Sequence, residues 1–343
     1  AVPTLALDAS RFATAMWFAR LCWFASWLGL GRPPQRAEQL RDAHAVCLLG
    51  GSNLFVQGRH RIIGLARLFQ LLAPALIAQR EGIPTYLLGH TIGPLCGPTA
   101  STLTRIVLSR ATLITVRERR SAELLAELGI PESRYRVAPD LAFALTPSSA
   151  DNLEVMRRAG LDQRFLALSV RQHPYLSRDA TNTMLSEVAQ FARDALYTGH
   201  VKRVAVIAQA RGPTSIEDDR PVSRQLAADI GPEAVFLEED LSASELANVY
   251  GAASAVVAVR LHAAIISMTA DTPAVAIGYF TSKTEGVFEL LGMPEMRCEF
   301  ADVTAGFLQQ RLQVMLSRDS RVTVHSRAEQ ARTEVQAIVG ALR

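Results

Sequence analysis

The sequence is poor in cysteine and has no large excess of either charge. Its 343 residues include only four cysteines, Cys22, Cys47, Cys96 and Cys298. No two of them have the spacing of a zinc site or a redox dithiol, and scattered thiols are typical of a reducing compartment. Lysine and arginine number 36 against 33 aspartate and glutamate residues, a net charge of +3. This balance argues against nucleic acid as a partner, so we expect a protein that binds none. The scattered thiols predict that the protein is cytoplasmic.

Two common phosphate-binding motifs are missing as well. No GK[ST] triplet occurs, and the glycine-rich stretch "GGSNLF" does not fit the GxGxxG pattern. What the sequence does have is apolar residues, since 49% of the chain is hydrophobic and 20% is charged. Such a composition at this length indicates a globular protein with room for two domains.

One N-terminal segment is unusually aromatic. Residues 12–31, "FATAMWFARLCWFASWLGLG", hold all three tryptophans of the chain and are interrupted by Arg20. A central arginine costs roughly 3 kcal/mol on membrane-insertion scales, which argues against a spanning helix. Two interpretations remain open: a helix packed on its own domain, and an interfacial helix that places the protein peripherally at the inner face of the membrane.

Short apolar runs and amphipathic stretches alternate along the rest of the chain. The predicted strands lie at 45–51, 85–89, 112–119, 165–171, 203–209, 234–239, 255–259 and 273–279, and the segment 135–145 closes the first half of the chain. The predicted helices lie at 61–82, 99–110, 121–130, 181–199, 219–231, 242–253, 283–291 and 322–342, with another starting at 261. This alternation is typical of an α/β fold with parallel sheets.

The polar stretch 146–164 interrupts the alternation and is the expected linker between domains. We therefore predict two Rossmann-like domains that face each other across a cleft, one over residues 1–147 and one over 148–343. Ligands of such sheets bind beyond the carboxyl ends of the strands.

Basic residues recur at these predicted strand ends. Arg117 lies at the end of a strand of the first domain, while Arg171 and Arg260 lie at strand ends of the second. Lys283 comes shortly after Tyr279 at another strand end. Arginine grips phosphate and carboxylate groups through paired N–H donors. The pattern therefore predicts a small and strongly anionic ligand.

Arg260, Leu261 and His262 form the sharpest of these patterns. They separate a predicted buried strand, "VVAV", from a predicted buried helix, "AAIISM". The backbone N–H groups of 261–263 would then lie at a helix N-terminus, which attracts anions. The imidazole of His262 could move protons near neutral pH. The alternative is a surface arginine beside a core histidine.

Several other residues have a structural and a functional interpretation. Gly51, Ser52 and Asn53 form either a plain turn or a loop that touches a ligand. Asp140 is equally well explained as a helix or turn cap. The acidic run 217–219 imitates a metal cluster, but no histidine or cysteine nearby completes it, so a solvated loop is expected. We predict no metal site.

Taken together, the segments "LLGGSNLF", "GHTIGPL", "LITVRERRSAELLAELGI", "VAPDLAFAL" and "AVVAVRLHAAIISMTADTPAVAIGYFTSK" resemble the polysaccharide pyruvyltransferases in order and spacing. The resemblance covers roughly residues 45–292. It implies a fold similar to GT-B glycosyltransferases. It also implies transfer of pyruvate from phosphoenolpyruvate to a sugar, as a ketal, on a cell-surface polysaccharide or its lipid-linked precursor. No cofactor is expected besides phosphoenolpyruvate, the donor substrate.

The resemblance also implies roles for individual residues. Arg260, Leu261 and His262 match the family's phosphoenolpyruvate-binding R-L-H motif, with Arg260 and His262 as the catalytic candidates. Three further family positions on the donor fall on Arg117, Arg171 and Lys283. In the first domain, Gly51, Ser52, Asn53 and His90 are the candidates for binding the acceptor. Family members open with a first strand and an N-x-G-D loop that we do not find, so we expect the first domain to lack its first strand.

Two other functions remain as alternatives. A GT-B glycosyltransferase would bind a nucleotide sugar and would need a carboxylate for the ribose, for which Glu285 or Glu289 could serve. A non-catalytic module that binds a sugar or an anion is the second alternative.

Overall fold

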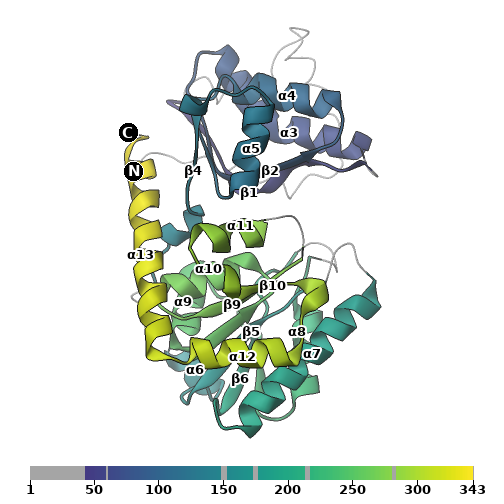
Figure 1. The fold of residues 1–343 in the computed structure, drawn as a ribbon, viewed down its shortest axis with the longest axis vertical. Coiled ribbons are helices and arrows are strands. Elements are labelled where there is room, and N and C mark those ends of the chain that lie inside the picture. Colours follow the sequence, from purple (N-terminus) through teal and green to yellow (C-terminus); the bar gives the residue numbers. More distant parts are fainter. Residues whose placement is uncertain are drawn as a thin grey trace. The chain divides into compact units, whose positions relative to one another are not determined.

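The computed structural model describes residues 43–58, 61–147, 153–172, 177–212, 217–279 and 283–342 (Figure 1). The aromatic segment 12–31 lies outside the described residues, and its two interpretations stay open. The chain divides into two compact units, with the division after Val137. Each unit is a parallel sheet with helices packed on it, which confirms the α/β class.

Unit 1 contains a four-stranded parallel sheet in which the strands follow one another in chain order. Its strands are β1 (Val46–Val56), β2 (Thr85–Leu95), β3 (Leu113–Val116) and β4 (Tyr135–Val137). Its helices are α3 (Arg61–Arg80), α4 (Pro98–Leu108), α5 (Arg119–Glu127) and the short η3 (Glu132–Arg134).

Helix α3 is apolar because one side of it forms much of the core of unit 1. Leu68, Leu72 and Leu76 are buried there among residues of the strands. Among the described residues, α3 is also the helix that is long and apolar enough to cross a membrane by length and composition alone. A core helix of a globular unit passes the same test, and the burial of these leucines explains the composition.

Strands β1 and β2 extend further than the sequence predicts. The glycine-rich stretches after 51 and 89 read as turns, but both strands continue past them, with shifts of register between Gly51 and Leu54 and between Leu54 and Val56. The physical reason lies in the pairing itself: the apolar residues beyond the glycines, such as Leu54 and Ile92, pair with each other and are buried. The expected turn 51–53 is therefore an irregular part of β1.

Unit 2 contains a six-stranded sheet in the order β10-β9-β8-β5-β6-β7, and all of its pairings are parallel. The strands are β5 (Phe165–Ser169), β6 (Arg203–Ile207), β7 (Ala234–Leu237), β8 (Ala255–Ala258), β9 (Ala274–Gly278) and β10 (Arg297–Glu299). Strands β5, β8 and β9 are buried along their whole length. This burial explains why they read as unbroken apolar runs.

Helices cover both faces of this sheet (Figure 1). The longer ones are α7 (Arg178–Tyr197), α8 (Arg220–Ile230), α9 (Ala243–Ala252), α10 (Leu261–Thr269), α11 (Lys283–Leu290), α12 (Ala305–Met315) and α13 (Arg318–Gly340). Helix α12 packs on α7, and α13 packs on α10. The sequence reading omitted α12 and β10. It placed the start of α13 four residues too late, although Ser317 caps that helix with its side chain.

The division between the units falls after residue 137, whereas the polar stretch predicted it after 147. The short helix η4 (Leu141–Ala144) explains the difference. Its Phe143 is buried in the core of unit 2, and the helix contacts α10 and α13. The polar residues that follow, which include α6 (Leu153–Arg158), therefore belong within unit 2.

Candidate functional site

Arg171 and Arg260 follow two strands that lie side by side at the switch point of the sheet in unit 2. Strand β5 pairs with β8, although five other elements separate them in sequence. From this pair the chain moves outward to β6 and β7 on one side, and to β9 and β10 on the other. In open α/β sheets ligands bind at such a point, beyond the carboxyl ends of the strands. The topology therefore brings the two arginines to the expected place.

Tyr279 joins Arg171 to Lys283. The Tyr279 hydroxyl accepts a hydrogen bond from Arg171 Nη1 at 2.7 Å and one from Lys283 Nζ at 3.2 Å. Both cations also lie against its ring, at 4.6 Å and 4.7 Å from the ring centre. Burial raises the pKa of Tyr279, but the charges of Lys283 and Arg171 outweigh it, so the pKa of the phenol lies below its usual range. The sequence places Tyr279 at a strand end, but its contacts with both Arg171 and Lys283 depend on the tertiary structure and are not predictable from local pattern.

Arg260 lies between strand β8 and helix α10, where it is the N-cap residue of the helix. Its backbone is extended, and its carbonyl accepts the N–H of Ala263 at 2.9 Å, as an N-cap residue does. Its guanidinium is held by the buried Asp219, through Nε to Oδ2 at 2.9 Å and Nη2 to Oδ1 at 2.7 Å. Burial raises the pKa of Asp219, and the hydrogen bonds from Arg260 oppose that rise.

Leu261 and His262 occupy the first turn of α10. The Leu261 side chain is buried in the core, so only the backbone of this residue is placed to meet a ligand. The His262 side chain is 54% exposed. Its Nε2 atom lies 3.8 Å from Oδ2 of Asp140, a buried carboxylate whose other oxygen accepts the N–H of Ala142. Asp140 is therefore both a cap of η4 and a neighbour of His262.

Arg117 belongs to unit 1, where it is buried in a polar cluster at the end of β3. Its Nε donates to Thr91 Oγ1 at 2.9 Å and its Nη2 donates to Ser52 Oγ at 2.9 Å. Thr91 in turn donates to Oε2 of the buried Glu118 at 2.8 Å, and Ser121 contacts the other oxygen of that carboxylate. The structure thus brings Arg117 together with one predicted acceptor residue, Ser52.

The other predicted acceptor residues also lie on β1 and β2. Gly51 pairs with His90 in the sheet, and Asn53 is part of β1. The His90 ring is buried, and its Nε2 lies 3.0 Å from the carbonyl oxygen of Leu48, so Nε2 is the nitrogen that donates. Its Nδ1 has no hydrogen-bond partner among the described residues. Burial lowers the pKa of His90 to about 4.

The acidic run 217–219 is not the solvated loop that the sequence predicts. Asp219 is fully buried against Arg260, and Asp218 is paired with Arg220 at 2.6 Å. The expectation was wrong because Arg260, from a distant part of the chain, buries and neutralises Asp219, while the neighbouring Arg220 pairs with Asp218. Among the described residues, no group of three or more histidine, cysteine or acidic side chains is arranged to hold a metal ion.

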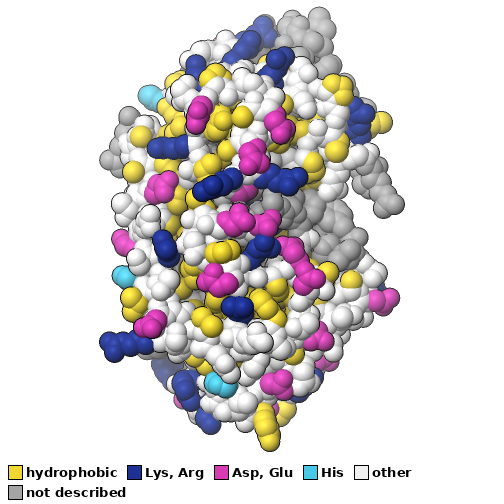
Figure 2. All heavy atoms as spheres, in the orientation of Figure 1, with side chains coloured by type: hydrophobic (Ala, Val, Ile, Leu, Met, Phe, Trp, Pro, Cys, Tyr) yellow, Lys and Arg dark blue, Asp and Glu magenta, His cyan; other side chains and the backbone are white. Residues whose placement is uncertain are grey.

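Outside these clusters, charges of both signs are interspersed. On the face drawn in Figure 2, lysine and arginine side chains lie among aspartate and glutamate side chains, as the net charge of +3 leads one to expect. Glu285, a candidate for binding a ribose, is paired with Arg297. That arginine also pairs with Glu299 at 2.6 Å.

The chain matches a known protein family in sequence. The family model "Polysaccharide pyruvyl transferase" matches residues 8–281. The amylovoran biosynthesis protein AmsJ of Erwinia amylovora is 27% identical over 282 residues, which cover 79% of this chain. The same match covers 65% of that relative, so the chain spans less than two thirds of its length.

Solved structures with low sequence identity share the fold. A putative UDP-N-acetylglucosamine 2-epimerase from Listeria monocytogenes matches with a TM-score of 0.64 at 13% identity, covering 98% of this chain and 81% of that one. S. aureus MnaA, solved with UDP, matches with a TM-score of 0.56 at 11% identity, covering 92% and 84%. These likenesses confirm the GT-B-like α/β class. At such identity they indicate the fold alone.

Proposed function

Because the chain belongs to the polysaccharide pyruvyl transferase family, we propose that it transfers a pyruvyl group from phosphoenolpyruvate to a sugar of a polysaccharide or of its lipid-linked precursor. The observation that carries the proposal is the meeting of Arg171 and Arg260 at the switch point of unit 2, with Lys283 joined to Arg171 through Tyr279. The N-terminus of α10 lies directly after Arg260.

The charge of this cluster suits the proposed donor. Phosphoenolpyruvate carries a phosphate with nearly two negative charges and a carboxylate with one more. Arg171, Arg260 and Lys283 each carry a positive charge, and the carboxylate of Asp219 pairs with Arg260. The orphan N–H groups of the first turn of α10 add favourable dipoles. An anion of this size and charge is thus favoured over a neutral sugar in this part of unit 2.

The chemistry requires one acid and one base. A proton delivered to the methylene carbon of the donor makes its central carbon electrophilic, and an acceptor hydroxyl attacks that carbon as its own proton is removed. Phosphate then leaves, and a second hydroxyl closes the ketal. His262 is the proposed proton carrier, because its exposed ring lies in the first turn of α10, right after Arg260. The Asp140 carboxylate would stabilise the imidazolium that forms.

Arg117, Ser52 and His90 are the residues that we propose for unit 1. Arg117 is held by the hydroxyl groups of Thr91 and Ser52, to which its Nε and Nη2 donate. The carboxylate of Glu118 reaches the same cluster through Thr91. A polar, hydroxyl-rich cluster of this kind suits a sugar or the donor carboxylate.

A nucleotide-sugar glycosyltransferase fits the contacts less well. Such an enzyme needs a carboxylate that accepts hydrogen bonds from a ribose. Glu285 stands in the first turn of α11, but it is paired with Arg297. Glu289 lies near the end of the same helix, where its side chain is exposed. The clustered cations at the strand ends favour the smaller donor.

Ligand-dependent thermal stability separates these functions. A ligand that binds the folded state raises the melting temperature in proportion to the logarithm of its concentration over Kd. We expect stabilisation by phosphoenolpyruvate and none by UDP-glucose or UDP-N-acetylglucosamine. We also expect Arg260→Gln to shift the stabilisation to much higher phosphoenolpyruvate concentrations, while Arg157→Gln, which removes an exposed arginine of α6, leaves it unchanged.

Turnover is the second part of this experiment. Release of inorganic phosphate from phosphoenolpyruvate, dependent on a lipid-linked oligosaccharide fraction, would support pyruvyl transfer. Stabilisation by a nucleotide sugar in place of phosphoenolpyruvate would overturn the proposal in favour of a glycosyltransferase. Binding of phosphoenolpyruvate without phosphate release from any acceptor fraction would overturn it in favour of a binding module.

A further inference from the structure

The acidic run 217–219 is folded back against residues 210 and 211 of unit 2. The N–H of Asp219 donates to the carbonyl of Ala210 at 2.9 Å, and the N–H of Ala210 donates to Asp219 Oδ2 at 3.0 Å. Asp218 pairs with Arg211 in an antiparallel bridge. The backbone therefore helps to hold the buried carboxylate of Asp219 in place, independently of its contacts with other side chains.

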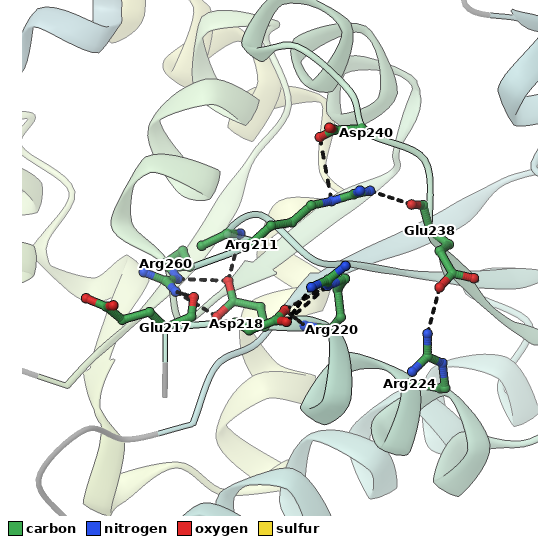
Figure 3. A network of polar contacts seen from close by, with 10 residues as sticks. Arg211, Glu217, Asp218, Arg220, Arg224, Glu238, Asp240 and Arg260 are labelled. Atoms are coloured by element: carbon green, nitrogen blue, oxygen red, sulfur yellow. Dashed lines mark hydrogen bonds and ion pairs between the residues drawn. The ribbon is translucent and has the colours of Figure 1, made fainter. Parts of the chain in front are cut away.

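Asp219 occupies one whole edge of the Arg260 guanidinium. Nε and Nη2 of Arg260 donate to its two carboxylate oxygens at 2.9 and 2.7 Å, and Nη2 also donates to the carbonyl of Glu217 at 3.2 Å. This is the paired edge with which arginine grips a phosphate or carboxylate. The remaining nitrogen, Nη1, has no hydrogen-bond partner among the described residues. Figure 3 shows Arg260 beside Glu217, within a network that continues through Asp218 to Arg220.

We propose that Asp219 is a positioning residue for the donor anion: it fixes Arg260 so that the guanidinium meets the anion through Nη1 alone. The inference rests on the proposed function and deepens it. Arg260 is then not expected to hold the donor through two parallel hydrogen bonds, because the edge formed by Nε and Nη2 is already bonded to Asp219. The remaining acceptors of the anion then fall to Arg171, Lys283 and the N-terminus of α10.

Two effects of Asp219 on an anion oppose each other. Its negative charge repels the donor, whereas its hydrogen bonds hold Arg260 in place. The charge is already balanced by Arg260 at 2.7 Å, so removing it gains little attraction. Replacing the carboxylate by an amide keeps one acceptor oxygen but places an N–H donor against at least one N–H group of Arg260, which loses its acceptor, and this is costly. We therefore expect the loss of position to dominate.

Asp219→Asn tests this inference through the donor. We expect kcat/KM for phosphoenolpyruvate to fall by about tenfold or more, which corresponds to about 1.4 kcal/mol. Asp218→Asn is the matched control, because Asp218 lies in the same segment but pairs with Arg220. The control should stay within about twofold of wild type. An unchanged or raised kcat/KM in Asp219→Asn would overturn the inference, because it would show that the carboxylate of Asp219 affects the donor only by repelling it.

A double-mutant cycle distinguishes positioning from general damage. If Asp219 acts through Arg260, Asp219→Asn should have no further effect on the Kd for phosphoenolpyruvate in an Arg260→Gln background. Additive losses would overturn the inference. If Asp219→Asn fails to fold, Asp219→Glu provides a second test, because it keeps the negative charge but moves the carboxylate by the length of one methylene group. Positioning predicts a loss in this variant too, and wild-type kinetics in it would contradict the inference.

A readout without the donor separates this inference from the proposed function. Phenylglyoxal modifies arginine, and peptide mapping reports its rate at Arg260 alone. We expect a severalfold faster reaction at Arg260 in Asp219→Asn than in wild type or Asp218→Asn, because the held edge becomes free. Equal rates would overturn the inference. If wild type binds no phosphoenolpyruvate while the rates differ as expected, the proposed function fails and the positioning of Arg260 stands.

Discussion

The Nε2 atom of His262 lies 3.8 Å from the Oδ2 atom of Asp140. The two residues come from different elements, since Asp140 precedes η4 and His262 lies in the first turn of α10. Asp140 is buried, and its Oδ1 accepts the N–H of Ala142 at 3.0 Å. A carboxylate fixed in this way can stabilise a positive charge on the imidazole whenever the ring takes up a proton.

This pair gives a prediction for catalysis. His262→Ala should lower kcat by about 10²–10⁴-fold while the Kd for phosphoenolpyruvate changes little, because the ring is proposed to move protons. Asp140→Asn keeps the oxygen that caps η4 but removes the charge, and should lower kcat by about tenfold. In the His262→Ala background it should have no further effect. Stopped-flow measurement of phosphate release checks all three, and a wild-type kcat in His262→Ala would exclude its role.

Tyr279→Phe should weaken donor binding without changing the fold. The phenyl ring would keep its contacts with Arg171 and Lys283, but the oxygen that both cations share would be gone. The cations would then lose their fixed separation, and we expect the Kd for phosphoenolpyruvate to rise about tenfold. Titration calorimetry measures it. Tyr197→Phe, at a tyrosine that is 93% exposed on α7, is the matched control. Tighter binding in Tyr279→Phe would show that the hydroxyl does not organise the cations.

His90 should make the stability of unit 1 depend on pH. Burial lowers the pKa of this histidine to about 4, so the folded state resists its protonation. The unfolded chain takes up the proton near pH 6.5. Stability is therefore present above pH 6.5 and is lost as the pH falls toward 4. The expected loss between pH 7.5 and pH 5 is about 2 kcal/mol.

Native-state hydrogen exchange of β1 and β2 peptides measures this effect in unit 1 itself. His90→Gln keeps a donor for the carbonyl of Leu48 but does not titrate, so its opening free energy should vary less with pH than that of wild type. His44→Gln removes an exposed histidine of the same unit and serves as the control. Equal pH dependence in wild type and His90→Gln would refute the assignment.

Gly50→Ala should destabilise unit 1. A Cβ atom at this position would lie 2.3 Å from the carbonyl oxygen of Gly89 on the neighbouring strand, and backbone cannot move aside as a flexible side chain can. We expect a loss of about 1–3 kcal/mol, the usual cost of overpacking. Gly58→Ala is the matched control, because its Cβ would meet nothing within 4 Å. Differential scanning calorimetry compares the two, and equal melting temperatures would contradict the close approach of β1 and β2.

Most elements of the fold are predictable from local pattern. The buried strands of unit 2 are short apolar runs, and the helices between them have helical periodicity and recognisable ends, such as the capping box of α9. Strand lengths in unit 1 are less predictable. Glycines at 50, 51 and 89 suggest turns, but pairing of the apolar residues beyond them extends both strands. Pairing depends on the neighbouring strand, which local sequence does not contain.

The sequence by itself determined the α/β class and the residues that follow the strands, because both depend on patterns within short windows. It placed Arg171, Arg260 and His262 at strand ends and helix starts. Only the tertiary structure decided which of these residues meet. The pairing of β5 with β8 brings the two arginines to one switch point, and the folding back of 217–219 buries Asp219 against Arg260. Such contacts join segments far apart in the chain, so they follow from strand order and packing rather than from local spacing.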